Sequence, residues 1–425
     1  MLIWLTVLVS LALLVGLLIS SMPFAAFMWH LWRRSPMHPD EVLPNAAVIL
    51  CLRGADSTLE RCIEGVLTQD YPQYEVIIIV DHVDDPAREV AQRVVHRLSN
   101  SKAHLETLTK PRESCSLKCS SLLQAISGLN NAIEILAFLD ADTTPYPGWL
   151  RELVSPLSQP GIGATTGARW FMPQTPTWGS LVRYQWGIAA VLTCNALGIA
   201  WGGTLAIRRD AFLRAGLQEK WASAFCEDTM IPEALRPLGL RLKYLPRMVM
   251  VNRESCRLRE YLHWCARQML TTRLYHRSAW RAVVAHAWIT ALCWIAPIFL
   301  AIWATLVQEW NALLWLSGGL GIFWAVQWLA MLLIERSAQR IVAARGEPSN
   351  WLTWRALWRT FVCIPITQMM YWRALVAAFW TRRVCWRGVW YDIAGPWQVR
   401  MNSYQPYSVA ASPASHAADS KHQPA

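Results

Sequence analysis

The hydrophobic positions of the chain fall into three blocks, and the first is an uninterrupted run near the start. Residues Leu2 to Leu31 include no Asp, Glu, Lys or Arg, and Arg33 and Arg34 follow directly. At a rise of about 1.5 Å per residue, such a run can cross a bilayer core of roughly 30 Å as a helix. A cleaved signal peptide has basic residues before a short apolar run, whereas here they follow a long one. The pattern predicts an uncleaved transmembrane anchor over residues 1–34, with its N-terminus outside.

The second block, residues 45–275, alternates short apolar runs with polar segments of helical periodicity. Ala46–Leu52, Val76–Val80 and Ile135–Leu139 are continuously apolar, which is the pattern of strands covered on both faces in a parallel sheet. Periodic segments near 58–68 and 85–98 predict the helices between these strands. The block is therefore expected to be a cytosolic α/β domain inserted between transmembrane helices.

The third block, residues 280–400, is predicted to be a membrane domain. Val283–Val307 and Ala312–Ile334 are long enough to be spans, and the four residues between them include no Lys or Arg. The next loop is rich in arginine, so it should face the cytosol while the short linker faces outward. The protein is thus expected to cross the membrane several times and to keep residues 45–275 on the cytosolic side.

The end of the chain is less regular. Phe361–Trp380 is apolar, but Pro365 and Arg373 interrupt it and arginines stand on both sides, so a re-entrant or interfacial element is expected there. Residues 401–425 are rich in Ser, Ala and Pro, and they are predicted to form a disordered tail.

Composition and charge agree with membrane contact. Hydrophobic residues make up 54% of the 425 residues and charged residues 16%, which excludes a disordered or collagen-like chain. Many of the 26 tryptophans and most of the excess arginines stand together after residue 264. This mixture favours a bilayer interface with anionic headgroups, and no nucleic-acid partner is expected. The 11 cysteines lack the spacing of a zinc site and are interpreted as reduced thiols.

The sharpest candidate for chemistry is Asp140-Ala-Asp142, directly after the apolar run Ile135–Leu139. Two carboxylates at the end of a buried strand need a cationic partner, and such a pair can hold Mg²⁺ or Mn²⁺ on a diphosphate. An Asp-x-Asp sequence alone also occurs in ordinary turns and helix caps.

Two further acidic motifs stand where they can face the same crevice. Asp81 and Asp85 follow the strand that ends at Val80, and ligands of open α/β sheets bind outside the carboxyl ends of the strands. Glu227 and Asp228 precede a helical pattern, where an acid can be a general base or simply a helix cap. Capping is also the alternative for Asp85.

These motifs together resemble those of the ceramide glucosyltransferase family, which belongs with the family 2 and family 21 glycosyltransferases. The resemblance begins with three segments, Cys51 to Asp56, Gln69 to Val76 and Asp81 to Ala87. It continues through Ser116-Leu-Lys118, Asp140-Ala-Asp142, Gly202 to Arg209, Glu227-Asp228 and Trp386-Arg-Gly-Val-Trp-Tyr391. The resemblance implies a GT-A type nucleotide-sugar-binding fold and UDP-sugar dependence.

The resemblance also implies roles for individual residues. Asp85, with Asp81 as a second candidate, would contact the nucleotide, and Lys118 would lie near the nucleotide-sugar. Asp140 and Asp142 would form the sugar-nucleotide and metal site, and Asp228 would be the general base beside Glu227. For Lys118 the alternative is an ordinary solvated lysine.

One departure from the family pattern concerns the helix predicted over Tyr261–Tyr275. The family has Gln or Arg, two residues and then Arg-Trp, but here Gln268 is followed by Met-Leu-Thr-Thr. Arg267 or Arg273 could supply the missing charge near the leaving diphosphate, and Trp264 the missing ring. The alternative is an amphipathic helix whose arginines snorkel to the interface.

The sequence thus predicts inverting transfer of one sugar from a UDP-sugar, with glucose favoured, to a membrane lipid hydroxyl such as that of ceramide or diacylglycerol. Two other functions stay open. A processive polysaccharide synthase would share the acidic motifs and the membrane helices, and a catalytically inactive membrane scaffold would account for the missing Arg-Trp pair.

Overall fold

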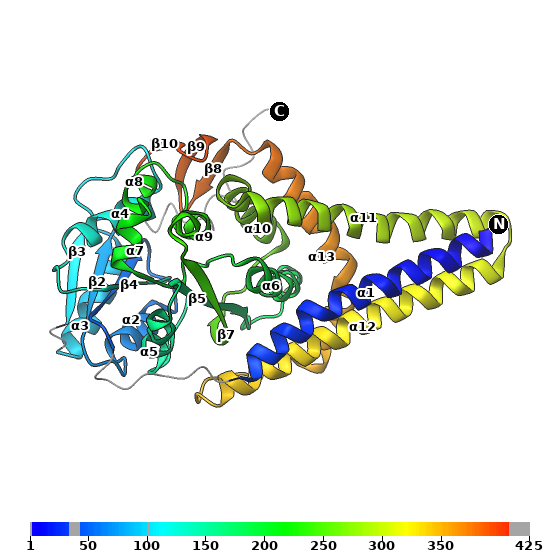
Figure 1. Cartoon of the computed structure of the whole chain (residues 1–425), viewed down its shortest axis with the longest axis horizontal. Helices are drawn as coiled ribbons and strands as arrows, with labels where there is room; N and C mark the ends of the chain where they lie inside the picture. Colours follow the sequence, from blue (N-terminus) through cyan, green and yellow to red (C-terminus); the bar gives the residue numbers. More distant parts are fainter. Residues whose placement is uncertain (1, 34–42, 100–101, 408–425) are drawn as a thin grey trace.

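The computed structural model describes residues 2–33, 43–99 and 102–407, although it does not describe the side chains of residues 19–23. Figure 1 shows a globular domain built around a twisted sheet, from which a long arm of helices projects. The arm contains the first helix of the chain together with two helices from its C-terminal half.

The central sheet has seven strands in the order β3-β2-β1-β4-β6-β5-β7. Four of them are parallel neighbours and form one half of the sheet: β1 (Ala46–Leu52), β2 (Tyr74–Val80), β3 (Ala103–Thr107) and β4 (Ile135–Leu139). In the other half β6 is antiparallel to β4 and β5, and β7 is parallel to β5: β5 (Ile162–Phe171), β6 (Thr204–Arg208) and β7 (Arg241–Asn252). The three strands predicted from the apolar runs are confirmed, and the bounds of β1 and β4 coincide with the predicted ones.

Helices cover both faces of this sheet, which explains why its parallel strands are apolar on both sides. One face is covered by α2 (Leu59–Leu67), α3 (Pro86–Arg97) and α5 (Trp149–Val154), the last of which continues into a short 3₁₀ turn, Ser155–Ser158. The other face carries α4 (Leu117–Ser127), α7 (Arg209–Arg214), α8 (Leu217–Trp221), α9 (Ile231–Leu235), the 3₁₀ turn Arg236–Leu238 and α10 (Leu258–Tyr275). The helices predicted near residues 58–68, 85–98 and 261–275 are all present.

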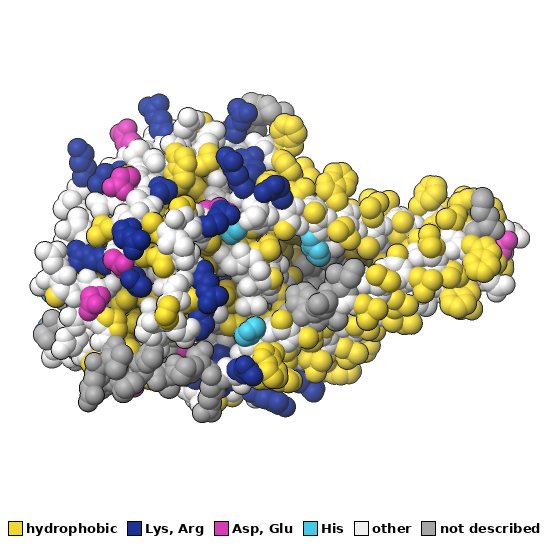
Figure 2. All heavy atoms as spheres, viewed as in Figure 1, with side chains coloured by type: hydrophobic (Ala, Val, Ile, Leu, Met, Phe, Trp, Pro, Cys, Tyr) yellow, Lys and Arg dark blue, Asp and Glu magenta, His cyan; other side chains and the backbone are white. Residues whose placement is uncertain are grey.

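The arm consists of α1 (Leu2–Trp32), α11 (Arg277–Leu306) and α12 (Trp310–Ala343). Figure 1 shows α1 lying along α12, with the start of α1 near the turn between α11 and α12. Leu2 packs there with Leu300, Ala304, Ala312 and Leu316. Figure 2 shows hydrophobic side chains covering this face of the arm, whereas Lys and Arg gather on the globular domain.

Within the described residues, three helices are long and apolar enough to cross a membrane: α11, α12 and α13 (Trp354–Trp380). The first two are the helices expected for the two spans predicted in the third block, and their crossing of a membrane stays a prediction. A re-entrant element over Phe361–Trp380 is wrong, because α13 is one continuous helix with Pro365 inside it, and the interfacial alternative stays a prediction. α13 packs against α10 and against α6 (Trp178–Leu197) of the globular domain. In α1, the apolar helical stretch identified is Leu2–Leu18, so the anchor stays a prediction.

A second, antiparallel sheet that the sequence did not reveal lies after α13. β8 (Arg383–Trp386), β9 (Val389–Gly395) and β10 (Gln398–Ser403) lie in the order β10-β9-β8. Val389, Tyr391 and Ile393 alternate with exposed residues along β9 and join the core formed by α4, α8 and α10. The predicted membrane domain therefore extends too far, because residues 383–403 belong to the globular domain. The tail predicted from Met401 also begins too early, and its residues 408–425 lie outside the described residues.

Candidate active site

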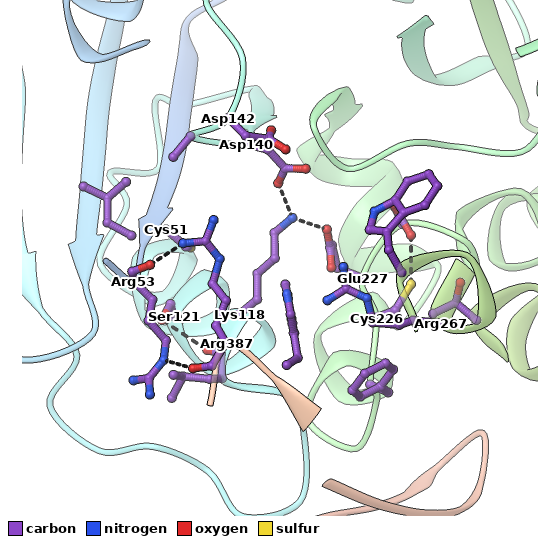
Figure 3. Close-up of a pocket in the computed structure, with 18 of the residues that line it drawn as sticks. Cys51, Arg53, Lys118, Ser121, Asp140, Asp142, Cys226, Glu227, Arg267 and Arg387 are labelled. Atoms are coloured by element: carbon purple, nitrogen blue, oxygen red, sulfur yellow. Dashed lines mark hydrogen bonds and ion pairs between the residues drawn. The ribbon is translucent and has the colours of Figure 1, made fainter. Parts of the chain in front are cut away.

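The candidate site is a crevice at the carboxyl ends of β1, β2 and β4, with a volume of about 260 Å³. Nine residues proposed from the sequence line it: Asp81, Lys118, Asp140, Asp142, Glu227, Asp228, Trp264, Arg267 and Gln268. Arg169 and Trp201, which the sequence did not single out, also line it. Arg53, Trp386 and Arg387 line it too, and they lie in motifs quoted for the family resemblance without a role of their own. The crevice thus brings together acids and cations from distant segments, as Figure 3 shows.

Lys118 lies at the centre of the crevice and joins two of the acidic motifs. The first turn of α4 positions it, because the side chain of Ser116 caps this helix by accepting a hydrogen bond from the backbone N–H of Cys119. The Lys118 ammonium lies 2.6 Å from Asp140 Oδ1 and 2.6 Å from Glu227 Oε1 (Figure 3). Although burial opposes its charge, these two carboxylates raise the pKa of Lys118 well above its ordinary value. The alternative of a solvated lysine is therefore wrong.

Asp140 and Asp142 occupy different electrostatic environments. Burial works against ionisation of Asp140, but Lys118 and Arg169 outweigh it and lower the pKa of Asp140. Burial raises the pKa of Asp142 to about 6, although Arg169 opposes this shift. Asn252 Nδ2 donates to Asp142 Oδ2 at 2.9 Å, while the buried Oδ1 atom of Asp142 has no hydrogen-bond partner among the described residues. Asp142 therefore presents an unpartnered carboxylate oxygen to a cation or a donor.

Glu227 and Asp228 approach the backbone of the loop before β6. Gly202 N donates to Asp228 Oδ2 at 2.7 Å, and the Cys226 thiol donates to Asp228 Oδ1 at 2.8 Å. A Cβ atom at Gly202 would lie 2.1 Å from Glu227 Oε1, so this close approach requires glycine. Because a carboxylate has about four acceptor positions, Asp228 can still accept a substrate hydroxyl.

The two acids after β2 have different tasks. Asp81 pairs with Arg53 and lines the crevice, and its Oδ1 atom is buried without a hydrogen-bond partner. Asp85 instead caps α3 by accepting from Ala87 N at 2.8 Å, and it also accepts from Gly54 N at 3.0 Å. Asp85 is not among the described residues that line the crevice. Helix capping, the alternative for Asp85, is therefore confirmed, and its nucleotide contact stays a prediction.

The site residues predicted on α10 also differ, because some line the crevice and one does not. Arg267 lines the crevice, where its guanidinium lies over the Trp386 ring at 4.9 Å. Burial lowers the pKa of Arg267 to about 10, and the neighbouring Arg169 and Arg387 contribute, so Arg267 stays charged at neutral pH. Trp264 and Gln268 also line the crevice. Arg273 points elsewhere, because it donates to the backbone oxygens of Phe379 and Thr381 at the end of α13.

The main omission of the sequence reasoning is the hairpin turn between β8 and β9. Arg387 has a φ of +48° and Gly388 a φ of +80°, the geometry of a tight two-residue hairpin turn. Arg387 pairs with Asp56 at 2.6 Å and projects into the crevice. The Arg-Gly pair between alternating apolar residues was the available signal for this turn.

Comparison with known proteins identifies the family of this chain. Residues 12–396 match the model of "Glycosyl transferase family 21". The chain belongs to this family. The likeness to ceramide glucosyltransferases that the motifs suggested is thereby confirmed at the level of the family.

The sequence relatives of this glycosyltransferase match over only part of its length. Glycosyltransferase AglE of Haloferax volcanii is 29% identical over 128 residues, which cover 29% of this chain and 39% of the relative. The ceramide glucosyltransferase of Komagataella phaffii is 25% identical over 91 residues, which cover 21% of this chain and 18% of the relative. In both cases the matched segment is well under two thirds of the relative's length.

A solved structure extends the comparison to the fold. The mannosyltransferase PcManGT of Pyrobaculum calidifontis, in complex with GDP-Man and Mn²⁺, has a TM-score of 0.51 and 18% identity. The match covers 89% of this chain and 99% of that protein. The GT-A type fold expected from the resemblance is therefore confirmed, with three apolar helices in the C-terminal half that could span a membrane.

The glycosyltransferase has a second, apolar chamber beside the polar crevice. Its volume is about 640 Å³, and side chains of α1, α6, α10, α11, α12 and α13 line it. The two cavities share several lining residues: Arg169, Trp201, Asp228, Trp264, Gln268 and Thr271. Trp201 Nε1 is buried at this boundary without a hydrogen-bond partner. The chamber thus runs from the helices of the arm to the carboxylate of Asp228.

Proposed function

We propose that this glycosyltransferase transfers one sugar from a UDP-sugar, with glucose favoured, to the hydroxyl of a membrane lipid such as ceramide or diacylglycerol. The observation that carries the proposal is the position of Asp228, which lines both the polar crevice and the apolar chamber. A lipid whose chains occupy the chamber would present its headgroup hydroxyl at this carboxylate. A nucleotide-sugar in the crevice would meet that hydroxyl from the other side.

The charges of the crevice suit a nucleotide diphosphate. Lys118, Arg169, Arg267 and Arg387 line it, and cations placed around a leaving diphosphate stabilise the charge that develops there. The ceramide glucosyltransferase among the relatives and the GDP-Man in the PcManGT complex support a sugar donor of this class. Asp81, Lys118 and Asp140 are the proposed donor contacts, while Gln268 and Arg267 are proposed to act near the diphosphate.

A divalent cation fits one position in the crevice. The buried Oδ1 atom of Asp142 has no hydrogen-bond partner, and Asp140 lies beside it. The described residues contain no cluster of three or more His, Cys, Asp or Glu able to hold a metal. Mg²⁺ is commonly bound by one or two carboxylates together with substrate phosphates, so a donor diphosphate would complete the site. Bound there, Mg²⁺ or Mn²⁺ would neutralise charge on the diphosphate, as the Mn²⁺ in the PcManGT complex suggests.

The proposed chemistry is a single displacement with inversion. Asp228 accepts the proton of the lipid hydroxyl while the hydroxyl oxygen attacks the anomeric carbon, and the bond from that carbon to the diphosphate breaks. Gly202 N–H and the Cys226 thiol hold the Asp228 carboxylate in place. Lys118 fixes Glu227 beside it through the 2.6 Å ion pair.

The arm would place this reaction at the bilayer surface. The apolar side chains of α11 and α12 are largely exposed, for example Trp288 (69%) and Leu314 (73%), which is the condition of lipid-facing helices. We propose that the arm crosses the bilayer and that the globular domain lies in the cytosol. A lipid could then enter the chamber between arm and domain without leaving the membrane.

The reaction is tested with membranes that contain the protein, labelled UDP-glucose or UDP-galactose, and Mn²⁺, followed by extraction into organic solvent. One labelled glycolipid is expected from the wild type and none from Asp142→Ala. Label in a water-soluble or insoluble polymer would indicate a polysaccharide synthase instead. No product with any donor, from protein that remains folded, would indicate a scaffold and refute the proposal.

The acceptor is tested separately by filling the chamber. Ala190 lines it, so Ala190→Trp should lower the rate with a long-chain lipid by at least about tenfold while UDP binding stays within twofold. Ile289→Trp adds comparable bulk to an exposed position on α11 and serves as the control. Equal rates for Ala190→Trp and the control would refute the assignment of the chamber to the acceptor.

A further inference from the structure

The described part of the chain ends in a segment that covers one corner of the crevice. Residues Tyr404–Tyr407, here called the C-terminal strap, follow β10 and lie over the ends of β1 and β2. The Tyr404 hydroxyl donates to the backbone oxygen of Asp81 at 3.1 Å. The Tyr407 ring lies so close to Gly54 that a Cβ atom there would be 2.7 Å from Tyr407 Cζ. The strap is therefore in contact with the loops that follow both strands.

Arg53 connects the strap to the crevice. Its Nε donates to the backbone oxygen of Arg387 at 2.9 Å, and one terminal nitrogen donates to that of Gln405 at 2.9 Å. The other terminal nitrogen pairs with Asp81 Oδ2. The Arg53 guanidinium carbon also lies 6.0 Å from the Tyr404 ring centre and 5.7 Å from that of Tyr407. These contacts fix the direction of a side chain that lines the crevice and is 10% exposed.

The same corner holds a carboxylate oxygen without a partner. The Asp81 side chain is 1% exposed and lines the crevice, and its Oδ1 atom accepts no hydrogen bond from any of the described residues. A buried acceptor of this kind is costly unless a ligand satisfies it. Three of the five N–H groups of Arg53 have the partners named above, so two are available to a ligand acceptor. The corner therefore offers one acceptor and up to two donors to a polar, planar or hydroxylated group.

We propose that the strap completes a subsite for the nucleoside half of the donor. The nucleotide contact of Asp81 is the one that the family resemblance implies, and here its Oδ1 atom accepts an N–H or O–H of the nucleoside. What the strap adds is the direction of Arg53, which donates to one of the nucleoside oxygens. Tyr404 and Tyr407 are positioning residues that act through Arg53 and close the corner from outside. The inference rests on the proposed function, because it presumes a nucleotide donor. The diphosphate half lies apart from the strap, toward Lys118 and Asp142.

Because the nucleoside and the diphosphate of the donor would bind in different parts of the crevice, their affinities can be tested separately. Calorimetry with the full-length protein and Mg²⁺ would compare UDP with inorganic pyrophosphate, which lacks the nucleoside. For Tyr407→Ala and Arg53→Ala we expect UDP to bind at least about tenfold more weakly, while the pyrophosphate Kd stays within twofold. Tyr407→Phe keeps the ring and should bind UDP like the wild type. In the lipid assay, Tyr407→Ala should raise the KM for the UDP-sugar and leave kcat within twofold.

Trp390→Ala is the matched control, because it removes a ring from the exposed face of β9, where 43% of Trp390 is exposed. Trp390→Ala should change neither the UDP affinity nor the pyrophosphate affinity. Unchanged or tighter UDP binding by Tyr407→Ala would refute the inference, as would an equal loss of pyrophosphate binding. If the wild type glycosylates lipid but the Tyr407→Ala KM is normal, only the strap inference fails. If the wild type binds neither UDP nor GDP, the proposed donor fails as well.

Discussion

Gly202 determines how closely the acids of the crevice approach the loop before β6. A methyl group there would lie 2.1 Å from Glu227 Oε1 and 3.2 Å from Asp228 Oδ2, so Gly202→Ala must displace the proposed base or its neighbour. Displacement of a catalytic group by about 1 Å can cost roughly 10²-fold in rate, and we expect a loss of that size in the lipid assay. Gly128→Ala is the control, because its nearest neighbour would be an ordinary 3.7 Å away. Full turnover by Gly202→Ala would show that catalysis does not need the close approach of these acids to the loop.

Asp142 gives the site a predictable pH dependence. Burial raises the pKa of this carboxyl to about 6, so it is ionised above pH 6 and protonated below it. A metal ligand must be deprotonated, and the apparent Kd for Mn²⁺ should therefore rise about tenfold for each unit of pH well below 6. Titration of Mn²⁺ followed by calorimetry from pH 5 to pH 8 measures this. An Mn²⁺ affinity that does not change over that range would remove Asp142 from the proposed metal site.

At the scale of single elements, α10 shows how two arginines of one helix differ in task. Arg267 faces the crevice, whereas Arg273 holds the end of α13 through two backbone oxygens. Loss of one donor that stabilises negative charge developing in a transition state costs about 10²–10³-fold in turnover, and we expect a loss of this size for Arg267→Ala. Arg273→Ala should keep kcat within about threefold and instead lower the thermal unfolding temperature in detergent. The opposite pattern would assign the missing family arginine to Arg273.

The elements that the sequence predicted well are those whose burial is nearly complete. β1 and β4 are covered on both faces, so their residues form apolar runs that begin and end with the strand. The hairpin of β8 and β9 escaped notice because its strands are short, half exposed and preceded by apolar helices. The acids of the site could be located because each follows a strand or precedes a helix. Arg169 could not be located in this way. Arg53 and Arg387 lie in motifs quoted for the family resemblance, but their roles depend on contacts between segments far apart in the chain.

At the scale of the whole molecule, Glu335 joins the arm to the globular domain. This buried carboxylate near the end of α12 accepts from Trp170 Nε1 of β5 at 2.8 Å and from Trp351 Nε1 at 2.7 Å. Glu335→Leu would leave two indole N–H groups without a partner, at a cost of about 1–3 kcal/mol each. We expect a clearly lower unfolding temperature in detergent, with donor affinity retained by the protein that stays folded. Glu335→Gln keeps an acceptor, so its unfolding temperature should fall less than that of Glu335→Leu. An equal fall in unfolding temperature for both variants would contradict this account.

The arrangement of the arm makes a prediction about membrane topology. The start of α1 and the turn between α11 and α12 lie at the same end of the arm, away from the sheet. The loop between α12 and α13 lies at the opposite end, where Arg345 donates to the backbone of β7.

If the arm crosses the bilayer, an epitope inserted after Gln308 should be accessible only from the side opposite the globular domain. An epitope inserted at Glu347 should be accessible only from the side of that domain. Protease protection in sealed vesicles of known orientation measures both positions, with donor binding as the check that each insertion protein is folded. Digestion of both epitopes from the same side would show that the arm lies on the membrane, and would refute the proposed crossing.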